Sequence, residues 1–179
     1  MKSFLELAAA RQSDRVYEPG RVIERDVLGR ILEAGRLAPS ACNGQPWHFT
    51  VVTEPELLAE VGKATSSLGM NKFVKDASAL VLITLESTNM TSRLGCGIKD
   101  KDFPMMDLGI ASAYITLAAE DEGVGSCILG WFDEKKIKEL VGIPQKKRLM
   151  LIISLGYNTK PKRRKIRKEF DKVVSFEKY

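Results

Sequence analysis

The sequence contains no apolar run of the roughly 18–20 residues that a membrane-spanning helix requires. Its first residues carry one early lysine and a short apolar stretch that Glu6 interrupts, which is not the pattern of a secretion signal. We therefore expect a protein of the cytoplasm with no membrane partner.

Cysteine and histidine are too few and too scattered for disulfide or metal chemistry. Cys42, Cys96 and Cys127 are widely spaced and form no CxxC pair, and His48 is the only histidine. We expect free thiols, no bound metal and a structural His48, because no Ser or Cys partner for catalysis is visible. Cys96 lies in the glycine-rich stretch 94–98, where a claim of reactivity would need a lowered thiol pKa.

The chain also lacks internal repeats, low-complexity linkers and the GxGxxG fingerprint of dinucleotide-binding folds. Its 179 residues are 44% hydrophobic, which is enough for one sizeable core and too apolar for a disordered chain. We expect residues 1–179 to form a single domain.

Positive charge is concentrated in one short segment. Residues 160–168 (KPKRRKIRK) hold seven of the 28 Lys and Arg residues and no acid, so the rest of the chain has 21 basic against 23 acidic residues. The net charge of +5 therefore belongs to a C-terminal tail, residues 160–179. Such a tail suits either a single phosphorylated ligand or a nucleic acid.

Hydrophobic periodicity predicts an alternation of helices and strands. Residues 79–85 (ALVLITL) are continuously apolar, as in a strand that is buried on both faces. The segment 103–122 is apolar or small nearly all round, so this helix must be covered by the core and by a candidate partner subunit. Asp107 within it is expected to make a structural hydrogen bond. Helices are expected at 3–10, 24–37, 55–64, 103–122 and 133–141, and strands at 47–53, 79–85, 126–129 and 148–155. This order favours an α+β sandwich with helices on both faces of one sheet.

Two short segments carry candidate ligand-binding groups. The sequence RQSDR at 11–15 places two guanidinium groups and a hydroxyl within five residues, which suits a phosphate but also fits a solvated helix end. The turn-rich segment 39–47 contains Asn43 and Gln45. Each of their side chains offers both a donor and an acceptor, as binding to the edge of an amide-bearing ring would require. The same side chains could instead bond to their own backbone.

Taken together, these segments resemble the FMN-dependent nitroreductase family. RQSDRVY near the start, LEAGRLAPSACNGQPWHFTVV, DLGIASAYITLAAEDEGVGSCILGWFD and GYNTKPKRRKIRK follow one another in the order of that family, and the similarity spans about residues 3–174. The resemblance implies a nitroreductase-like three-layer sandwich with a central, mostly antiparallel sheet. It also implies a homodimer with the long central helix at the interface and FMN bound between the two copies.

The resemblance further implies which residues contact FMN. The phosphate would be held by the first motif and by the tail, at Arg11, Ser13, Lys165 and Arg167, with Lys162, Arg163 and Arg164 as alternatives if the tail is shifted. Gln12 of the first motif is also expected to bind the cofactor. Arg15 would lie beside the pyrimidine, where a fixed cation stabilises the reduced flavin electrostatically. The ring would be contacted by Pro39, Ser40, Ala41 and Asn43 of the other subunit, by Asn71, and by Ile128, Leu129 and Gly130 at the N5 edge.

The implied activity is a ping-pong oxidoreduction. NAD(P)H would pass a hydride to flavin N5, and a nitroaromatic, a quinone or a similar small electrophile would then take the electrons. No side chain is assigned as a catalytic proton donor. Partners are expected to be a second copy of the chain and small molecules, without nucleic acid. The alternatives are nucleic-acid or anionic-surface binding through the tail, and a flavin-binding protein without nitroreductase turnover.

Overall fold

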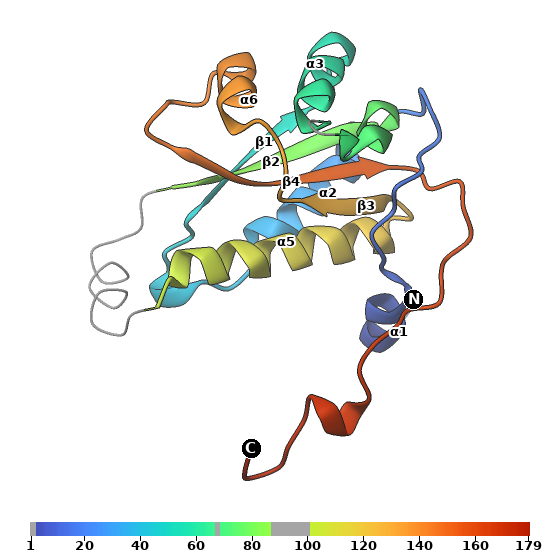
Figure 1. The fold of residues 1–179 in the computed structure, drawn as a ribbon, viewed down its shortest axis with the longest axis vertical. Helices are drawn as coiled ribbons and strands as arrows, with labels where there is room; N and C mark the ends of the chain where they lie inside the picture. Colours follow the sequence, from blue (N-terminus) through green and yellow to red (C-terminus); the bar gives the residue numbers. More distant parts are fainter. Residues whose placement is uncertain (1–2, 67–68, 87–100) are drawn as a thin grey trace.

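The computed structural model (Figure 1) describes residues 3–66, 69–86 and 101–179. The helices are α1 (Phe4–Ala10), α2 (Arg25–Arg36), α3 (Pro55–Thr65), α5 (Phe103–Asp121) and α6 (Glu134–Val141), and the strands are β1 (Trp47–Val52), β2 (Ala79–Leu85), β3 (Gly125–Leu129) and β4 (Arg148–Gly156). These bounds lie within one residue of those expected from the sequence. Three short 3-10 turns, Ala41–Asn43, Lys72–Asp76 and Phe170–Lys172, were not predicted. The Cys96 stretch lies outside the described residues.

The four strands form one antiparallel sheet in the order β1-β2-β4-β3. Helices α2 and α5 cover one face, and α3 and α6 cover the other (Figure 1). The central position of β2 explains why its sequence is apolar throughout. Val81 and Ile83 enter the core beneath α2 and α5, while Leu80 and Leu82 enter the core on the opposite face. The expected α+β sandwich with an antiparallel sheet is confirmed.

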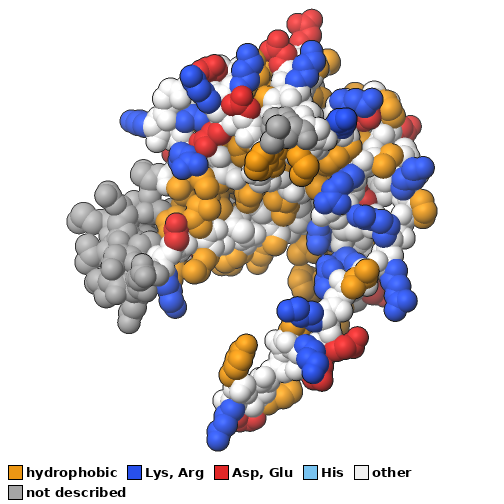
Figure 2. Space-filling view, viewed as in Figure 1, with side chains coloured by type: hydrophobic (Ala, Val, Ile, Leu, Met, Phe, Trp, Pro, Cys, Tyr) orange, Lys and Arg blue, Asp and Glu red, His pale blue; other side chains and the backbone are white. Residues whose placement is uncertain are grey.

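Helix α5 is buried along its inner side, whereas its outer side is only partly covered by the described chain. Leu108, Ala111 and Ile115 are buried against the sheet and α2. On the outer side, Met106, Ile110 and Tyr114 are exposed by 37–53%. Hydrophobic side chains accordingly reach the surface along this edge of the body in Figure 2. The outer side therefore has the composition of a surface that another molecule covers.

After β4, the chain runs past the end of the sheet and alongside α1, and the C-terminal tail then extends away from the body (Figure 1). Figure 2 shows Lys and Arg side chains gathered where this tail leaves the body. The N-terminal segment and the start of the tail thus lie together near the C-terminal end of α5, since α1 packs against that helix and Lys162 meets its Glu120. None of the helices in the described ranges is both long and apolar enough to span a membrane.

Candidate functional site

A cavity of about 620 Å³ lies between α1, the outer side of α5, the end of β3 and the C-terminal tail. Its lining combines small or apolar side chains with three cationic ones: Ala8, Ala9, Gly109, Ala113, Thr116, Leu117, Ile128, Arg11, Lys165 and Arg167. The structure therefore brings the first basic motif and the tail together at one place. These are the tail residues that the unshifted register places at a phosphate.

Arg11 of the first motif reaches this cavity because α1 ends at Ala10, directly before it. Ser3 caps the helix start reciprocally with Glu6. After Arg11 the chain is extended and runs parallel to β3, where the Asp14 N–H donates to the Ser126 carbonyl at 2.9 Å. An extended chain alternates its side chains between two sides, so Gln12 and Asp14 point inward. The other side carries Arg11, Ser13 and Arg15, which are partly or largely exposed.

The cations around the cavity repel one another. Burial lowers the pKa of Lys165, and the charges of Arg11 and Arg167 lower it further. The Lys165 ammonium also donates to the Ala8 carbonyl of α1 at 2.5 Å. A group of like charges facing a shared cavity is stabilised when an anion enters it. The site thus has the electrostatics of an anion receptor.

Arg15 lies close to this group but lines a neighbouring pocket of about 160 Å³ together with Ser13. Burial raises the pKa of the Cys127 thiol on β3, while the charge of Arg15 and a hydrogen bond from Ser13 oppose that rise. Arg15 and Ser13 therefore both act on the same thiol of β3. The structure places Arg15 beside the larger cavity and not on its lining.

Gln12, by contrast, is turned away from the cavity. Its Nε2 donates to Asp14 Oδ1 at 2.7 Å, and its Oε1 accepts from the Arg163 N–H at 3.0 Å. Both ends of the amide are therefore used within the protein. The structure thus turns the Gln12 side chain toward the protein's own polar groups and not toward the cavity lining.

The predicted ring-contacting loop, residues 39–43, lies at the other end of α5. Asp107, in the first turns of that helix, is buried and accepts from the Ala41 N–H at 3.1 and 3.2 Å, which confirms its structural hydrogen bond. The Ser40 hydroxyl accepts from the Gln45 N–H at 3.0 Å. Cys42 and Asn43 have positive φ values of 51° and 52°. The loop thus holds a strained backbone that Asp107 fastens to α5.

Loss of this anchor should loosen the loop. Asp107→Ala removes both acceptors of the Ala41 N–H, and we expect it to cost about 1–3 kcal/mol of unfolding free energy. Asp107→Asn keeps one acceptor and should cost less. Hydrogen exchange at the Ala41 amide should accelerate more in the alanine variant than in the asparagine variant. Equal exchange rates in both variants and the wild type would contradict the anchoring role.

The remaining predicted residues lie around the end of β3. Ile128 points into the cavity, whereas Leu129 is 3% exposed and packs in the core beneath α3 and α6. Asn71 has a φ of 52°, and its Nδ2 donates to the Trp131 carbonyl at 2.9 Å and to the Thr65 carbonyl at 3.2 Å. Asn71 thereby ties its own turn to the chain that follows Gly130. A Cβ built on Gly130 meets no atom of the described residues within 4 Å, so packing against those residues does not require glycine there.

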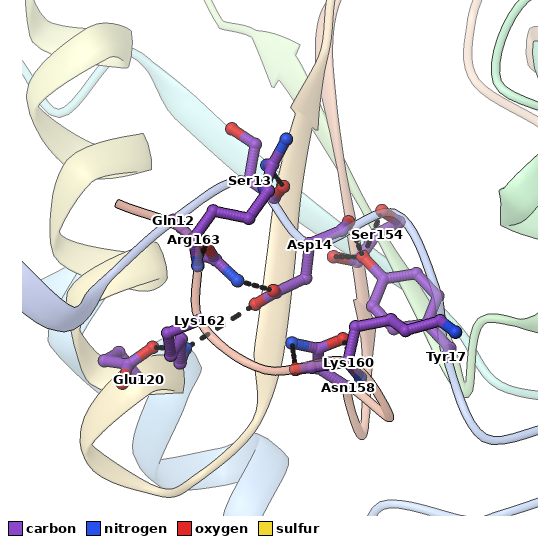
Figure 3. Close-up of polar contacts among 10 residues, drawn as sticks. All are labelled: Gln12, Ser13, Asp14, Tyr17, Glu120, Ser154, Asn158, Lys160, Lys162 and Arg163. Carbon is purple, nitrogen blue, oxygen red and sulfur yellow. Dashed lines mark hydrogen bonds and ion pairs between the residues drawn. The ribbon is translucent and has the colours of Figure 1, made fainter. Parts of the chain in front are cut away.

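Sequence reasoning missed a charged cluster behind the first motif, in which two buried acids meet one partly exposed lysine. Asp14, Glu120 and Lys162 lie together between the N-terminal segment, the end of α5 and the tail (Figure 3). The sequence held one signal for this cluster: side chains alternate along the extended motif, so Asp14 points inward. An isolated acid within a basic motif does not reveal which lysine it meets.

Comparison with known proteins agrees with this geometry. The family model described as "Nitroreductase family" matches residues 8–157. The chain is 33% identical over 161 residues to the "Putative NADH dehydrogenase/NAD(P)H nitroreductase" of Archaeoglobus fulgidus, which covers 88% of this chain and 86% of that protein. It is 26% identical to the iodotyrosine deiodinase of Thermotoga neapolitana, over 90% of this chain and 92% of that one.

A solved structure agrees as well. An FMN-dependent nitroreductase from Clostridium difficile R20291 superposes with a TM-score of 0.80 at 27% identity, covering 98% of this chain and all of the other. A family model spanning most of the chain and a relative above 30% identity lead to the same conclusion. The chain belongs to the nitroreductase family.

Proposed function

We propose that this protein is an FMN-dependent NAD(P)H oxidoreductase that reduces small electrophiles such as nitroaromatics or quinones. The observation that carries the proposal is the convergence of Arg11, Lys165 and Arg167 on one cavity with an apolar floor. Relatives with NAD(P)H nitroreductase in their names, and the FMN-dependent structural neighbour, support the choice of donor and cofactor.

The residues of the cavity fit FMN at both of its ends. The three cations supply the charge and the donors that a phosphate needs. The floor is the outer side of α5 from Gly109 to Leu117, about 12 Å along the axis, where Ala113 and Thr116 are small. Small side chains leave a flat apolar surface, which suits a planar ring.

The side chains have distinct tasks in this proposal. Arg11, Lys165 and Arg167 bind the phosphate, and the Ser13 hydroxyl reaches it from the neighbouring pocket. Arg15 supplies a fixed positive charge beside the ring. FMN, when bound, would supply the carrier that accepts a hydride from NAD(P)H and passes electrons to the electrophile. Among the described residues that line the cavity, the ionisable ones are all cationic. We therefore assign proton delivery to solvent.

A second copy of the chain would complete the site. Asp107 and Glu120 are about 20 Å apart along α5. Residues 39–43 are fastened at Asp107 and the tail is held at Glu120, so the loop and the tail meet α5 near its opposite ends. Two α5 helices packed antiparallel about a twofold axis would bring the partner's Asn43 to the cavity. The same packing would cover the exposed Met106, Ile110 and Tyr114.

Cofactor uptake tests the proposal directly. The purified protein should bind added FMN with quenching of flavin fluorescence, and it should absorb at about 450 nm, as protein-bound oxidised flavins do. Under anaerobic conditions, NADH or NADPH should bleach this band, and a nitroaromatic or quinone should restore it. A protein that takes up no FMN would refute the proposal, and one that binds FMN without bleaching would be a flavin-binding protein without turnover.

Nucleic-acid binding through the tail has less support from the structure. Lys162 and Arg163 make contacts within the chain, to Glu120 and Ser13 respectively. Charges engaged in this way offer less to a phosphate backbone. Binding of a DNA duplex that weakens steeply with added salt would restore the alternative.

A further inference from the structure

A basic run such as KPKRRKIRK does not by itself specify which cations face a ligand. Residues 162–165 are all Lys or Arg, and Arg167 and Lys168 follow, so a shift of one or two positions would present a similar charge. The structure nevertheless places Lys165 and Arg167 at the cavity. Something outside the run must select this register.

Lys162 is distinguished from its neighbours by the buried carboxylates that it meets. Its Nζ lies 2.5 Å from Glu120 Oε2 and 3.8 Å from Asp14 Oδ2 (Figure 3). The carboxyl side chains of Asp14 and Glu120 are only 1% and 7% exposed. Burying a carboxylate is costly unless a cation and hydrogen bonds compensate it. Docking of Lys162 therefore lowers the free energy of both acids at once.

Several contacts fix the position of the Asp14 carboxylate. Its Oδ1 accepts from Gln12 Nε2 at 2.7 Å, and its Oδ2 has no hydrogen-bond partner among the described residues, which leaves the ammonium of Lys162 as the compensating charge. A Cβ on Gly125 would lie 2.9 Å from Asp14 Oδ2, so β3 fixes this carboxylate by close approach. The carboxylate therefore has little freedom to follow a different lysine.

The residues that follow Lys162 attach the tail to the N-terminal segment, between the two acids and the cavity. The Arg163 N–H donates to Gln12 Oε1 at 3.0 Å, and Arg163 Nη2 donates to the Ser13 carbonyl at 2.9 Å. Two residues further on, Lys165 is bonded to α1 through Ala8. The tail is thus attached to the same segment that presents Arg11.

We propose that Asp14 and Glu120, acting through Lys162, are positioning residues that lock the tail in the register at which Lys165 and Arg167 face Arg11. The consequence for FMN rests on the proposed function, but the lock itself does not. Buried ion pairs often add little net stability, and fixing one register among alternatives is their best-attested use.

The first experiment compares FMN with riboflavin, which has the same ring and no phosphate. Lys162→Met should weaken FMN binding by about tenfold or more, while riboflavin affinity stays within about twofold. Lys168→Met, a change of the same kind at an exposed position of the tail, should leave both affinities near the wild-type values. Equal losses for FMN and riboflavin, or no loss for FMN, would overturn the proposal.

A combined variant separates register from stability. Asp14→Asn, Glu120→Gln and Lys162→Met together leave no uncompensated buried charge, so the melting temperature should return toward the wild-type value relative to Lys162→Met alone. FMN affinity should nevertheless remain about tenfold reduced, because the ion pairs that fix the register are then absent. Recovery of FMN affinity together with the melting temperature would show a merely structural role.

Hydrogen exchange tests the lock without any flavin. In Lys162→Met, the Arg163 amide should exchange about tenfold or more faster than in the wild type, and the amides of β2 should be unaffected. An unchanged rate at Arg163 would overturn the lock whatever the protein binds. Failure of the wild type to bind FMN, with a faster exchange at Arg163 in the variant, would overturn the proposed function alone.

Discussion

Arg11→Ala is expected to weaken FMN binding by about 10- to 150-fold, because a hydrogen bond to a charged partner is worth about 1.5–3 kcal/mol. Arg11 is the cavity-lining cation that the N-terminal segment contributes, and Lys165 and Arg167 face it from the tail. In the absence of an anion these charges oppose one another, since Arg11 contributes to the lowered pKa of Lys165. The substitution should therefore cost cofactor affinity and little folding stability.

Titration of flavin fluorescence measures this effect, with riboflavin and Arg164→Ala as controls. Arg164 belongs to the same basic run but is exposed and does not line the cavity. Its replacement should change FMN affinity much less than the loss of Arg11, and Arg11→Ala should barely alter riboflavin binding. If both Arg11→Ala and Arg167→Ala bound FMN like the wild type, the phosphate assignment would be wrong.

Gly35→Ala is expected to destabilise the fold by about 1–3 kcal/mol, the usual cost of overpacking a core. Helix α2 packs on α5 at this point, and an added Cβ would lie 2.5 Å from Ile115 Cγ1 and 2.8 Å from Cδ1. Ile115 is fully buried, so its side chain has nowhere to move. The two helices would have to separate, and with them the surface that supports the cavity floor.

Gly29→Ala provides the matched control within the same helix. A Cβ at Gly29 meets no atom within 4 Å in the part of the chain that the structure describes, so the higher helix propensity of alanine should stabilise the protein by up to about 1 kcal/mol. Urea unfolding at equal protein concentration, with and without FMN, should show changes of opposite sign for the two variants. Changes of the same sign and size would mean that close packing of α2 on α5 does not explain Gly35.

Local pattern was sufficient to predict the helices and strands. The unbroken apolar run of β2 and the all-round apolar sequence of α5 reflect elements that need cover on both sides, and this requirement is visible in the residues themselves. Strand order could not be predicted in this way. All four strands are largely apolar, and the order β1-β2-β4-β3 depends on contacts between residues far apart in the chain.

The candidate site, too, could be predicted from the sequence only in part. The sequence by itself determined that two basic segments and a turn-rich loop carry the ligand-binding groups, because side-chain chemistry and spacing are local properties. Only the tertiary structure decided which side chains share a cavity. In the structure, Gln12 points inward, Arg15 lines a neighbouring pocket and Lys162 pairs with two buried acids. A charge in a run of equal charges acquires its role from the partner across the fold, and sequence spacing does not specify that partner.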